Sequence, residues 1–253
     1  MKISVIIPAW KAQDFLKRCI DSIEKQTVQP DEILIGIDSC QSTLDKCREI
    51  AAKNDKVKLY YFPEHIGCYR IRNTLATLAN GELIVLFDAD DAMYENYIEK
   101  MGKITSKGCF ARPMFINNID GRITQNTQPA EGCIAIMRED IIYNAGWEPW
   151  VCAADSEFRE RALRQGMKWK SSEEVIFVRF IHDNNLTRGK GTDMKSAYRK
   201  NCKKEILDRR ECGYLRDTIA IGRCLNITAM EEEEKKEKHI TKRRKQSAIS
   251  KAR

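Results

Sequence analysis

The sequence lacks several features that would place it in a common class. Its 253 residues contain no run of about 20 apolar residues, which excludes a polytopic membrane protein. The 10 cysteines form no Cys-x-x-Cys pair, and 3 histidines are too few for a His-rich metal site. The apolar stretch 3–7 ends at Pro8 and is too short for the apolar region of a signal peptide. We therefore expect a cytoplasmic protein with reduced, mostly buried cysteines.

The charge is unevenly distributed along the chain. The formal net charge is +7 and the hydrophobic fraction is 42%, enough to bury a core. Residues 1–187 carry 24 basic and 27 acidic side chains, whereas residues 188–253 carry 20 and 10. We expect a globular domain over 1–187, a basic helical extension over 188–230 and a charged, disordered tail over 231–253. Such asymmetry favours an anionic partner for the C-terminal part, either nucleic acid or a membrane surface, although a solvated helical surface would look the same.

Strand and helix patterns alternate through the first hundred residues with a period of about 25–30 residues, as in parallel sheets. Strands are predicted over 3–7, 32–37, 57–62 and 82–87, with helices around 15–23, 42–53 and 67–79 between them. The second half predicts strands over 133–137 and 174–181, and helices over 155–165, 194–212 and near 214–225. The fold class is therefore α/β, with a mainly parallel, Rossmann-like sheet flanked by helices and a basic helical C-terminal appendage.

The tetrapeptide Asp88-Ala89-Asp90-Asp91 directly follows a buried apolar strand. Ligands of such sheets bind beyond the carboxyl ends of the strands. Two carboxylates at that point repel one another unless a cation is present, and hard oxygen ligands suit Mg²⁺ or Mn²⁺. The alternative is a polar turn that caps the next helix.

The order of these landmarks resembles the family 2 nucleotide-sugar glycosyltransferases of the GT-A fold. The resemblance is close over residues 1–100 and looser to about 187. Its matching segments are Ser4–Trp10, Phe15–Ile23, Ile33–Ser39, Gly67 with Arg72-Asn73, and Asn80–Asp91. Trp10-Lys11 and Ser39-Cys40 depart from the family pattern, which has Tyr-Asn and a second Asp at these places.

The resemblance implies a role for each matching residue. The sugar-donor nucleotide would contact Pro8, Ala9, Trp10, Asp38, Arg70 or Arg72, and Asp88, with Asp38 holding the base and an arginine holding the diphosphate. A Mn²⁺ or Mg²⁺ ion would be bound by Asp88, Asp90 and His182. Structural alternatives are that Pro8 ends a strand, Trp10 is core and Asp38 caps a helix.

Inverting transfer needs a carboxylate that deprotonates the acceptor. The family supplies it from an acidic pair that opens a helix, and Asp155 aligns with the second member of that pair, while Ala154 replaces the first. Asp155 is therefore the predicted general base, with Glu157 and then Glu148 as alternatives. The structural alternative is that Asp155 only caps the helix. Trp147 and Trp150 flank it and are either acceptor-stacking platforms or core residues.

The predicted function is metal-dependent, inverting transfer of a sugar from a nucleotide-sugar to a hydroxyl group, with a UDP-sugar as the favoured donor. The acceptor is a glycan, a lipid-linked glycan or a hydroxymethylated DNA base. The basic groups at 195–210 and 242–245 favour a polyanion, either DNA or an anionic membrane. The alternative is a non-catalytic nucleic-acid-binding protein with a GT-A-like core. A nucleotidyltransferase is disfavoured because no Gly-rich or basic phosphate loop follows the first strand.

Overall fold

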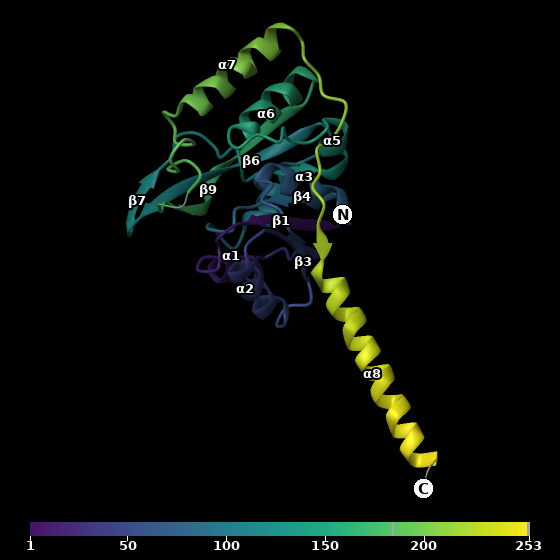
Figure 1. The fold of residues 1–253 in the computed structure, drawn as a ribbon. Coiled ribbons are helices and arrows are strands. Elements are labelled where there is room, and N and C mark those ends of the chain that lie inside the picture. The colour runs from purple at the N-terminus through teal and green to yellow at the C-terminus, as the bar shows by residue number, and fades with distance from the viewer. Residues whose placement is uncertain (184, 252–253) are drawn as a thin grey trace.

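The computed structural model describes residues 1–183 and 185–251, with side chains of the last helix described through His239. Its N-terminal half consists of parallel strands joined by helices (Figure 1). The strands are β1 (Ile3–Ala9), β2 (Glu32–Asp38), β3 (Val57–Phe62) and β4 (Leu83–Leu86), and the helices are α1 (Leu16–Glu24), α2 (Gln41–Ala51) and α3 (Cys68–Leu78). The predicted alternation is confirmed, with ends that differ by one or two residues.

The second half adds antiparallel strands to the same sheet, in the order β10-β3-β2-β1-β4-β8-β6-β9-β5, with β7 paired to β6. β8 runs antiparallel to both β4 and β6, whereas β6 and β9 are parallel to each other. The elements are β5 (Ala92–Met93), α4 (Tyr97–Ile104), β6 (Cys109–Ile119), β7 (Arg122–Gln125), β8 (Ala135–Met137), α5 (Arg138–Tyr143), α6 (Ala154–Arg164), β9 (Lys168–Phe180), α7 (Ala197–Glu211), β10 (Leu225–Asn226) and α8 (Ile227–Lys251).

Two apolar cores cover the two faces of the sheet. Alternate residues of β1 point to opposite sides, so that Val5 belongs to one core and Ile6 to the other. Helices α1, α2 and α4 cover the first face and α3, α5 and α6 the second. Gly36 lets α3 approach β2 closely, because a Cβ at this position would lie 2.3 Å from Cγ2 of Ile71. This layered α/β arrangement is the predicted fold class.

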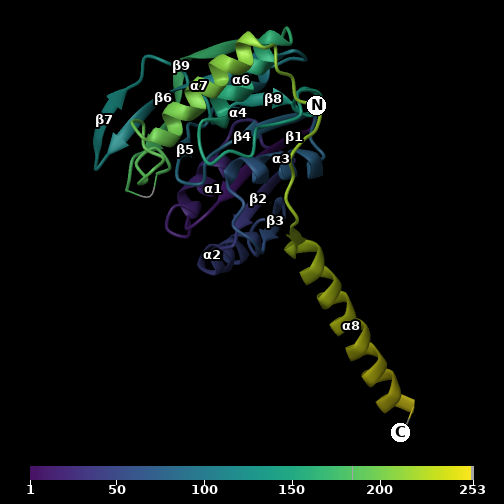
Figure 2. The same ribbon diagram turned by 45° about the horizontal axis from the view of Figure 1, so that its top comes forward.

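The C-terminal segment departs from the predicted pattern in two places. Residues 214–224, where a short helix was predicted, form an irregular strap that leads to β10 at the sheet edge. Residues 227–251 form the helix α8, which projects from the body (Figures 1 and 2). Glu and Lys four residues apart, as in the Glu234–Lys238 ion pair, favour helix over the predicted disorder. Residues 252 and 253 lie outside the described part of the chain.

Glu32 ties together the strands that carry the site. Its buried carboxylate accepts hydrogen bonds from Ser4 Oγ (2.7 Å) and the Asn80 backbone N–H (2.6 Å), and it pairs with Lys58 Nζ at 2.6 Å. Burial alone would raise the pKa of Glu32, but the bonds from Lys58, Ser4 and Asn80 outweigh it and lower the pKa to about 2. Glu32 therefore stabilises the fold above its unfolded pKa, and this stability is lost as the pH falls through about 2.

We expect the Glu32→Gln protein to be less stable than wild type at pH 7 and to lose less stability between pH 4.5 and 2. The measurement is the free energy of unfolding by denaturant across this pH range. Glu82→Gln, a change at an exposed carboxyl, is the matched control and should keep the wild-type profile. Equal pH profiles for the Glu32→Gln and wild-type proteins would contradict the assignment.

Candidate active site

The ends of β1 and β2 form one side of the site. Of the three residues predicted at the end of β1, Ala9 is buried and Trp10 is 49% exposed, so the alternative of Trp10 as a core residue is wrong. The Trp10 ring lies 4.9 Å from that of His65, and Lys11 Nζ lies 4.5 Å from the Trp10 centroid. These groups form a partly aromatic, basic surface beside Pro8.

Asp38 lies at the end of β2, where it is almost fully buried. Its two carboxylate oxygens accept hydrogen bonds from the backbone N–H groups of Ile66 (2.9 Å) and Gly67 (3.0 Å). Nδ1 of His65 lies 2.9 Å from Oδ2 of Asp38. Asp38 thus fixes the loop that leads into α3. A nucleotide base could contact Asp38 only through the carboxylate lone pairs that these hydrogen bonds leave free.

Asp88 and Arg72 meet at the end of β4. Oδ1 of Asp88 accepts a 2.6 Å hydrogen bond from Nη2 of Arg72, and Oδ2 lies 3.6 Å from Sγ of Cys133. Burial would lower the pKa of the Arg72 guanidinium, but the Asp88 carboxylate outweighs it and raises that pKa. Arg72 is thus largely neutralised within the protein. Arg70 is half-buried and makes no ion pair with the described residues, which leaves it the freer cation for a diphosphate.

The other two predicted metal ligands, Asp90 and His182, contact each other. Oδ2 of Asp90 lies 3.0 Å from Nε2 of His182 and accepts a 2.8 Å hydrogen bond from Asn185. The His182 ring stacks on Phe15 with a centroid distance of 4.3 Å, and its Nδ1 is buried without a partner among the described residues. The structure thus brings Asp90 and His182 together, as the sequence predicted.

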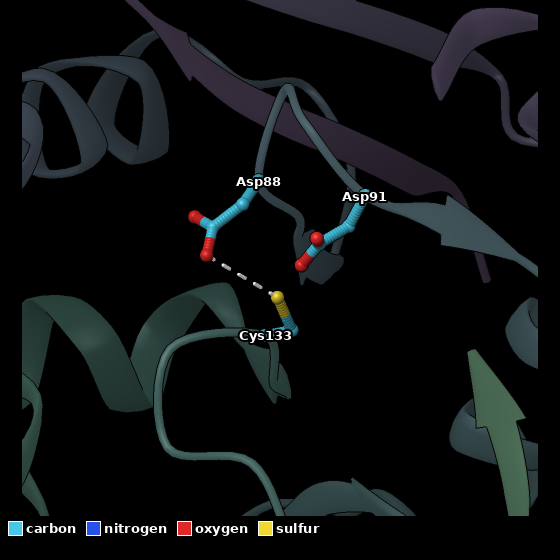
Figure 3. A group of neighbouring side chains, drawn as sticks. All are labelled: Asp88, Asp91 and Cys133. Carbon is cyan, nitrogen blue, oxygen red and sulfur yellow. Dashed lines mark hydrogen bonds between the residues drawn. The ribbon is translucent and has the colours of Figure 1, made fainter. Parts of the chain in front are cut away.

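Asp91 and Cys133, which were not predicted as ligands, lie beside Asp88. One ligand atom of each of these three residues lies within 4.8 Å of the other two (Figure 3). Burial, and then the charges of Asp90 and Asp88, raise the pKa of Asp91 well above its usual value. Among the described residues, the group within metal-binding distance is thus Asp88, Asp91 and Cys133, and not the predicted set of Asp88, Asp90 and His182. Its two carboxylates suit a hard divalent cation such as Mn²⁺ or Mg²⁺, whereas a thiol suits a softer metal.

Asp155 lies in the first turn of α6, two residues after Ala153. Ala153 has φ 66°, a left-handed conformation that costs an alanine about 1–2 kcal/mol. Asp155 is half-buried and forms no ion pair with the described residues. Ser156, next to Asp155, donates a 3.1 Å hydrogen bond to Glu131, and a Cβ at the following Gly132 would lie 3.7 Å from Oδ2 of Asp88. The start of α6 is therefore linked to the Asp88 carboxylate through residues 131 and 132.

The two alternative bases are held in ion pairs. Glu157 forms a bidentate pair with Arg161, with distances of 2.9 and 3.0 Å, and both side chains are buried. Glu148 pairs with Arg209 at 2.7 Å and with Arg216 at 2.9 Å. Of the three predicted carboxylates, Asp155 alone is without an arginine partner among the described residues.

The tryptophans near Asp155 are structural. Trp147 is 1% exposed and stacks on Phe158 with a centroid distance of 4.7 Å, so the reading as an acceptor platform is wrong for this residue. Trp150 is partly buried, and the Arg209 guanidinium lies 5.0 Å from its ring. Of the residues that follow Gly146, Trp147 and Glu148 are therefore buried, whereas Trp150 is partly buried and Val151 is exposed.

Comparison with known proteins gives the family. Residues 4–142, more than half of the chain, match the family model "Glycosyl transferase family 2". The chain belongs to glycosyl transferase family 2. This confirms the predicted family and the glycosyltransferase class.

Curated relatives match the same region. The chain is 31% identical over 103 residues to glycosyltransferase GlyA and 30% identical over 100 residues to glycosyltransferase GlyG, both from Streptococcus pneumoniae serotype 4. The matches cover 40% and 39% of this chain but only 15% of GlyA and 33% of GlyG. The chain therefore corresponds to a part of these longer relatives.

Solved structures with the same fold include S. aureus TarS 1-349 in complex with UDP-GlcNAc. The TM-score is 0.65 at 14% sequence identity, over 85% of this chain and 74% of the other. At this identity the likeness shows the fold, and it confirms the GT-A-like architecture of this family 2 member. Among the described residues, no helix is both long and apolar enough to cross a membrane.

Three residues around the family 2 site were not found from the sequence. His65 reaches Asp38, Cys133 reaches Asp88, and Glu131 accepts a 3.1 Å hydrogen bond from Ser156 in α6. Each comes from a loop without a recognisable motif. Only the observed folding of these loops reveals their roles, because their partners are 25 to 45 residues away in the chain.

Cys40, two residues after Asp38, lies beside the hydroxyl groups of Ser42 and Thr43. Burial would raise its pKa, but hydrogen bonding by Ser42 and Thr43 outweighs burial and lowers the pKa to about 7. At pH 7 we expect iodoacetamide to label Cys40 roughly tenfold faster than an ordinary thiol, with a half-maximal rate near pH 7. Mass spectrometry of the labelled peptides measures this rate. Cys212→Ser, which removes another exposed thiol, should not change it, and half-maximal labelling near pH 9 would refute the prediction.

Proposed function

We propose that this family 2 protein transfers a sugar from a UDP-sugar to a hydroxyl acceptor with inversion, in a reaction that depends on Mn²⁺ or Mg²⁺. The main support is the position of Asp155. It is a carboxylate without an arginine partner among the described residues, and its neighbour Ser156 is hydrogen-bonded to Glu131, which precedes Gly132 beside Asp88. The solved complex of TarS with UDP-GlcNAc supports UDP as the nucleotide.

The proposed mechanism assigns the proton and the bonds to this chain's groups. Asp155 accepts the proton of the acceptor hydroxyl as its oxygen attacks the anomeric carbon. The bond from that carbon to the diphosphate oxygen breaks on the opposite side, and its electron pair leaves with UDP, which gives inversion. Asp90 and His182, together with Asp88, would hold the metal ion, which neutralises charge on the leaving diphosphate. Arg70 adds a cation on the same side.

For the acceptor, the surface charge of α7 favours a polyanion. Of the predicted basic groups, Arg199, Arg209 and Arg210 bind other parts of the protein. The exposed cations that remain are lysines at positions 195, 200, 203 and 204. One relative, 30% identical over 95 residues, is a poly(ribitol-phosphate) beta-glucosyltransferase from Bacillus spizizenii. A phosphate-rich glycan, an anionic lipid-linked glycan and hydroxymethylated DNA all meet this charge requirement. The side chains of Lys242–Lys245 lie outside the described ones.

A screen of sugar donors tests the reaction. Thermal shift and hydrolysis are measured with UDP-, GDP- and TDP-sugars, each with Mn²⁺, Mg²⁺ or EDTA. We expect stabilisation and slow hydrolysis with a UDP-sugar and metal, both lost in EDTA. If no nucleotide stabilises the protein while DNA still binds in a salt-dependent way, the non-catalytic nucleic-acid-binding function is supported instead.

The acceptor screen compares a phosphate-rich glycan, anionic vesicles and hydroxymethylated DNA at several salt concentrations. We expect Lys200→Glu/Lys203→Glu to weaken binding of the polyanionic acceptor about tenfold or more, and less so at high salt. Lys25→Glu/Lys53→Glu makes the same charge change at exposed positions just after α1 and α2 and is the control. Equal losses in the two variants would argue against a binding role for α7.

A further inference from the structure

Residues that follow β9 in the chain contact the loop that precedes the proposed base. This loop comprises residues 146–153 and leads directly into Asp155 at the start of α6. From α7, Arg209 pairs with Glu148 of the loop at 2.7 Å, and the Tyr198 hydroxyl accepts a 3.2 Å hydrogen bond from the Val151 N–H. From the strap that follows α7, Arg216 pairs with Glu148 at 2.9 Å. Two separate elements therefore meet at a single carboxylate of the loop.

These contacts form one continuous network of charges, which we call the Glu148 network. It runs from Arg216 through Glu148 to Arg209, and from Arg209 to Glu157 at 3.7 Å. Glu157 pairs with Arg161, whose Nη2 donates a 2.7 Å hydrogen bond to the Gly146 carbonyl at the start of the loop. The network thus spans the loop from Gly146 to the first turns of α6. The side chains of Glu148 and Arg216 are each only 9% exposed, so solvent screens their pairing weakly.

The backbone of the loop needs such support. Ala153, two residues before Asp155, is held in the left-handed region with φ 66°, which persists only where the surroundings determine it. Asn73 of α3 joins the loop to the strap. Its Nδ2 donates 2.8 Å hydrogen bonds to the Trp147 carbonyl of the loop and to the Ala220 carbonyl of the strap. Arg216 Nη1 donates to that same Trp147 carbonyl at 3.2 Å. The loop is therefore clamped between α3 and the strap.

From this geometry we propose that Arg216 and Arg209 are positioning residues, which act through Glu148 to hold Asp155 against the sugar-donor site. The segment from α7 to β10 is then part of the catalytic domain and not a separable basic appendage. The inference rests on the proposed role of Asp155 as the base. Deleting residues from 190 onward would remove both arginines of the clamp, so this deletion cannot isolate an acceptor-binding function.

The test compares Arg216→Ala and Arg216→Lys with Arg210→Ala, which breaks a more exposed ion pair of α7 with Glu160. UDP affinity, UDP-GlcNAc hydrolysis and amide hydrogen exchange of residues 147–158 are measured in each full-length protein, well below its melting temperature. For Arg216→Ala we expect kcat for hydrolysis to fall about tenfold or more, UDP affinity to stay within twofold, and exchange at 147–158 to become faster. Arg216→Lys should recover part of kcat, and Arg210→Ala should resemble wild type.

Three results would overturn the proposal: unchanged exchange at 147–158 in Arg216→Ala, an equal loss of kcat in Arg210→Ala, or UDP affinity falling in parallel with kcat. The exchange measurement needs no activity, so it separates this inference from the proposed function. A wild-type protein that binds no nucleotide and hydrolyses no nucleotide-sugar would contradict the proposed function. Even in that case, faster exchange in Arg216→Ala would still show that Arg216 holds the loop.

Discussion

Replacing Asp155 by Asn is expected to lower kcat for sugar transfer or donor hydrolysis about 10²–10⁴-fold, the usual contribution of a general base. The amide keeps the size of the side chain and can still accept the hydrogen bond that Asp155 Oδ1 receives from the Ser156 N–H at 2.9 Å. It cannot take up the acceptor proton. UDP affinity should stay within about twofold, because the residues proposed to bind the nucleotide lie on β1, β2 and α3. Steady-state kinetics and calorimetric titration with UDP measure the two effects separately.

The matched control for Asp155→Asn is Glu160→Gln on the same helix. Glu160 forms ion pairs with Arg159 and Arg210 near the surface, so its loss should cost little stability and leave kcat near wild type. Removing the Asp155 charge from the first turn of α6 should cost about 0.3–1 kcal/mol of helix stability. An Asp155→Asn protein with full kcat would exclude Asp155 as the base.

The sequence alone was sufficient for the parts of the fold that depend on local patterns. Buried β-branched runs such as residues 3–7, and helical apolar spacing from Leu16 to Ile23, form the predicted elements because each buries one side of its pattern. The convergence of Asp90 and His182 followed from family order, although the two residues are 92 positions apart. These features repeat across a family and can therefore be recognised.

Long-range ion pairs could not be predicted, and they decide which charges are free. Glu157 and then Glu148 were the alternatives to Asp155 as the predicted base. Arg209, 61 residues after Glu148, forms an ion pair with Glu148 and lies 3.7 Å from Glu157. The same arginine had been counted in a basic surface for an anionic partner. Sequence spacing cannot show this, because the contact depends on how α7 packs over α6. The net charge of residues 188–253 therefore overstates the surface available to a polyanion.

The second large effect is expected for Asp88→Asn. The Arg72 side chain is 4% exposed, and its Nη2 bonds to Asp88 at 2.6 Å, so the substitution leaves a buried cation without its counter-charge. Because Asp88 itself is 39% exposed, water compensates in part, and we expect a loss of about 1–3 kcal/mol in the free energy of unfolding. Activity should fall at least about 100-fold, since the carboxylate next to the diphosphate site is lost. Denaturant unfolding and UDP-sugar hydrolysis measure both effects.

Asp90→Asn separates the two roles of these carboxylates. Asp90 is bonded to His182 and Asn185 and not to a buried arginine, so this variant should keep most of the stability while losing the Mn²⁺-dependent part of stabilisation by UDP. Asp88→Asn should lose both. Equal unfolding free energies for the two variants would show that the Arg72–Asp88 pair contributes nothing special to the fold. Mn²⁺-dependent UDP binding that survives in Asp90→Asn would remove Asp90 from the proposed metal site and favour the group of Asp88, Asp91 and Cys133 instead.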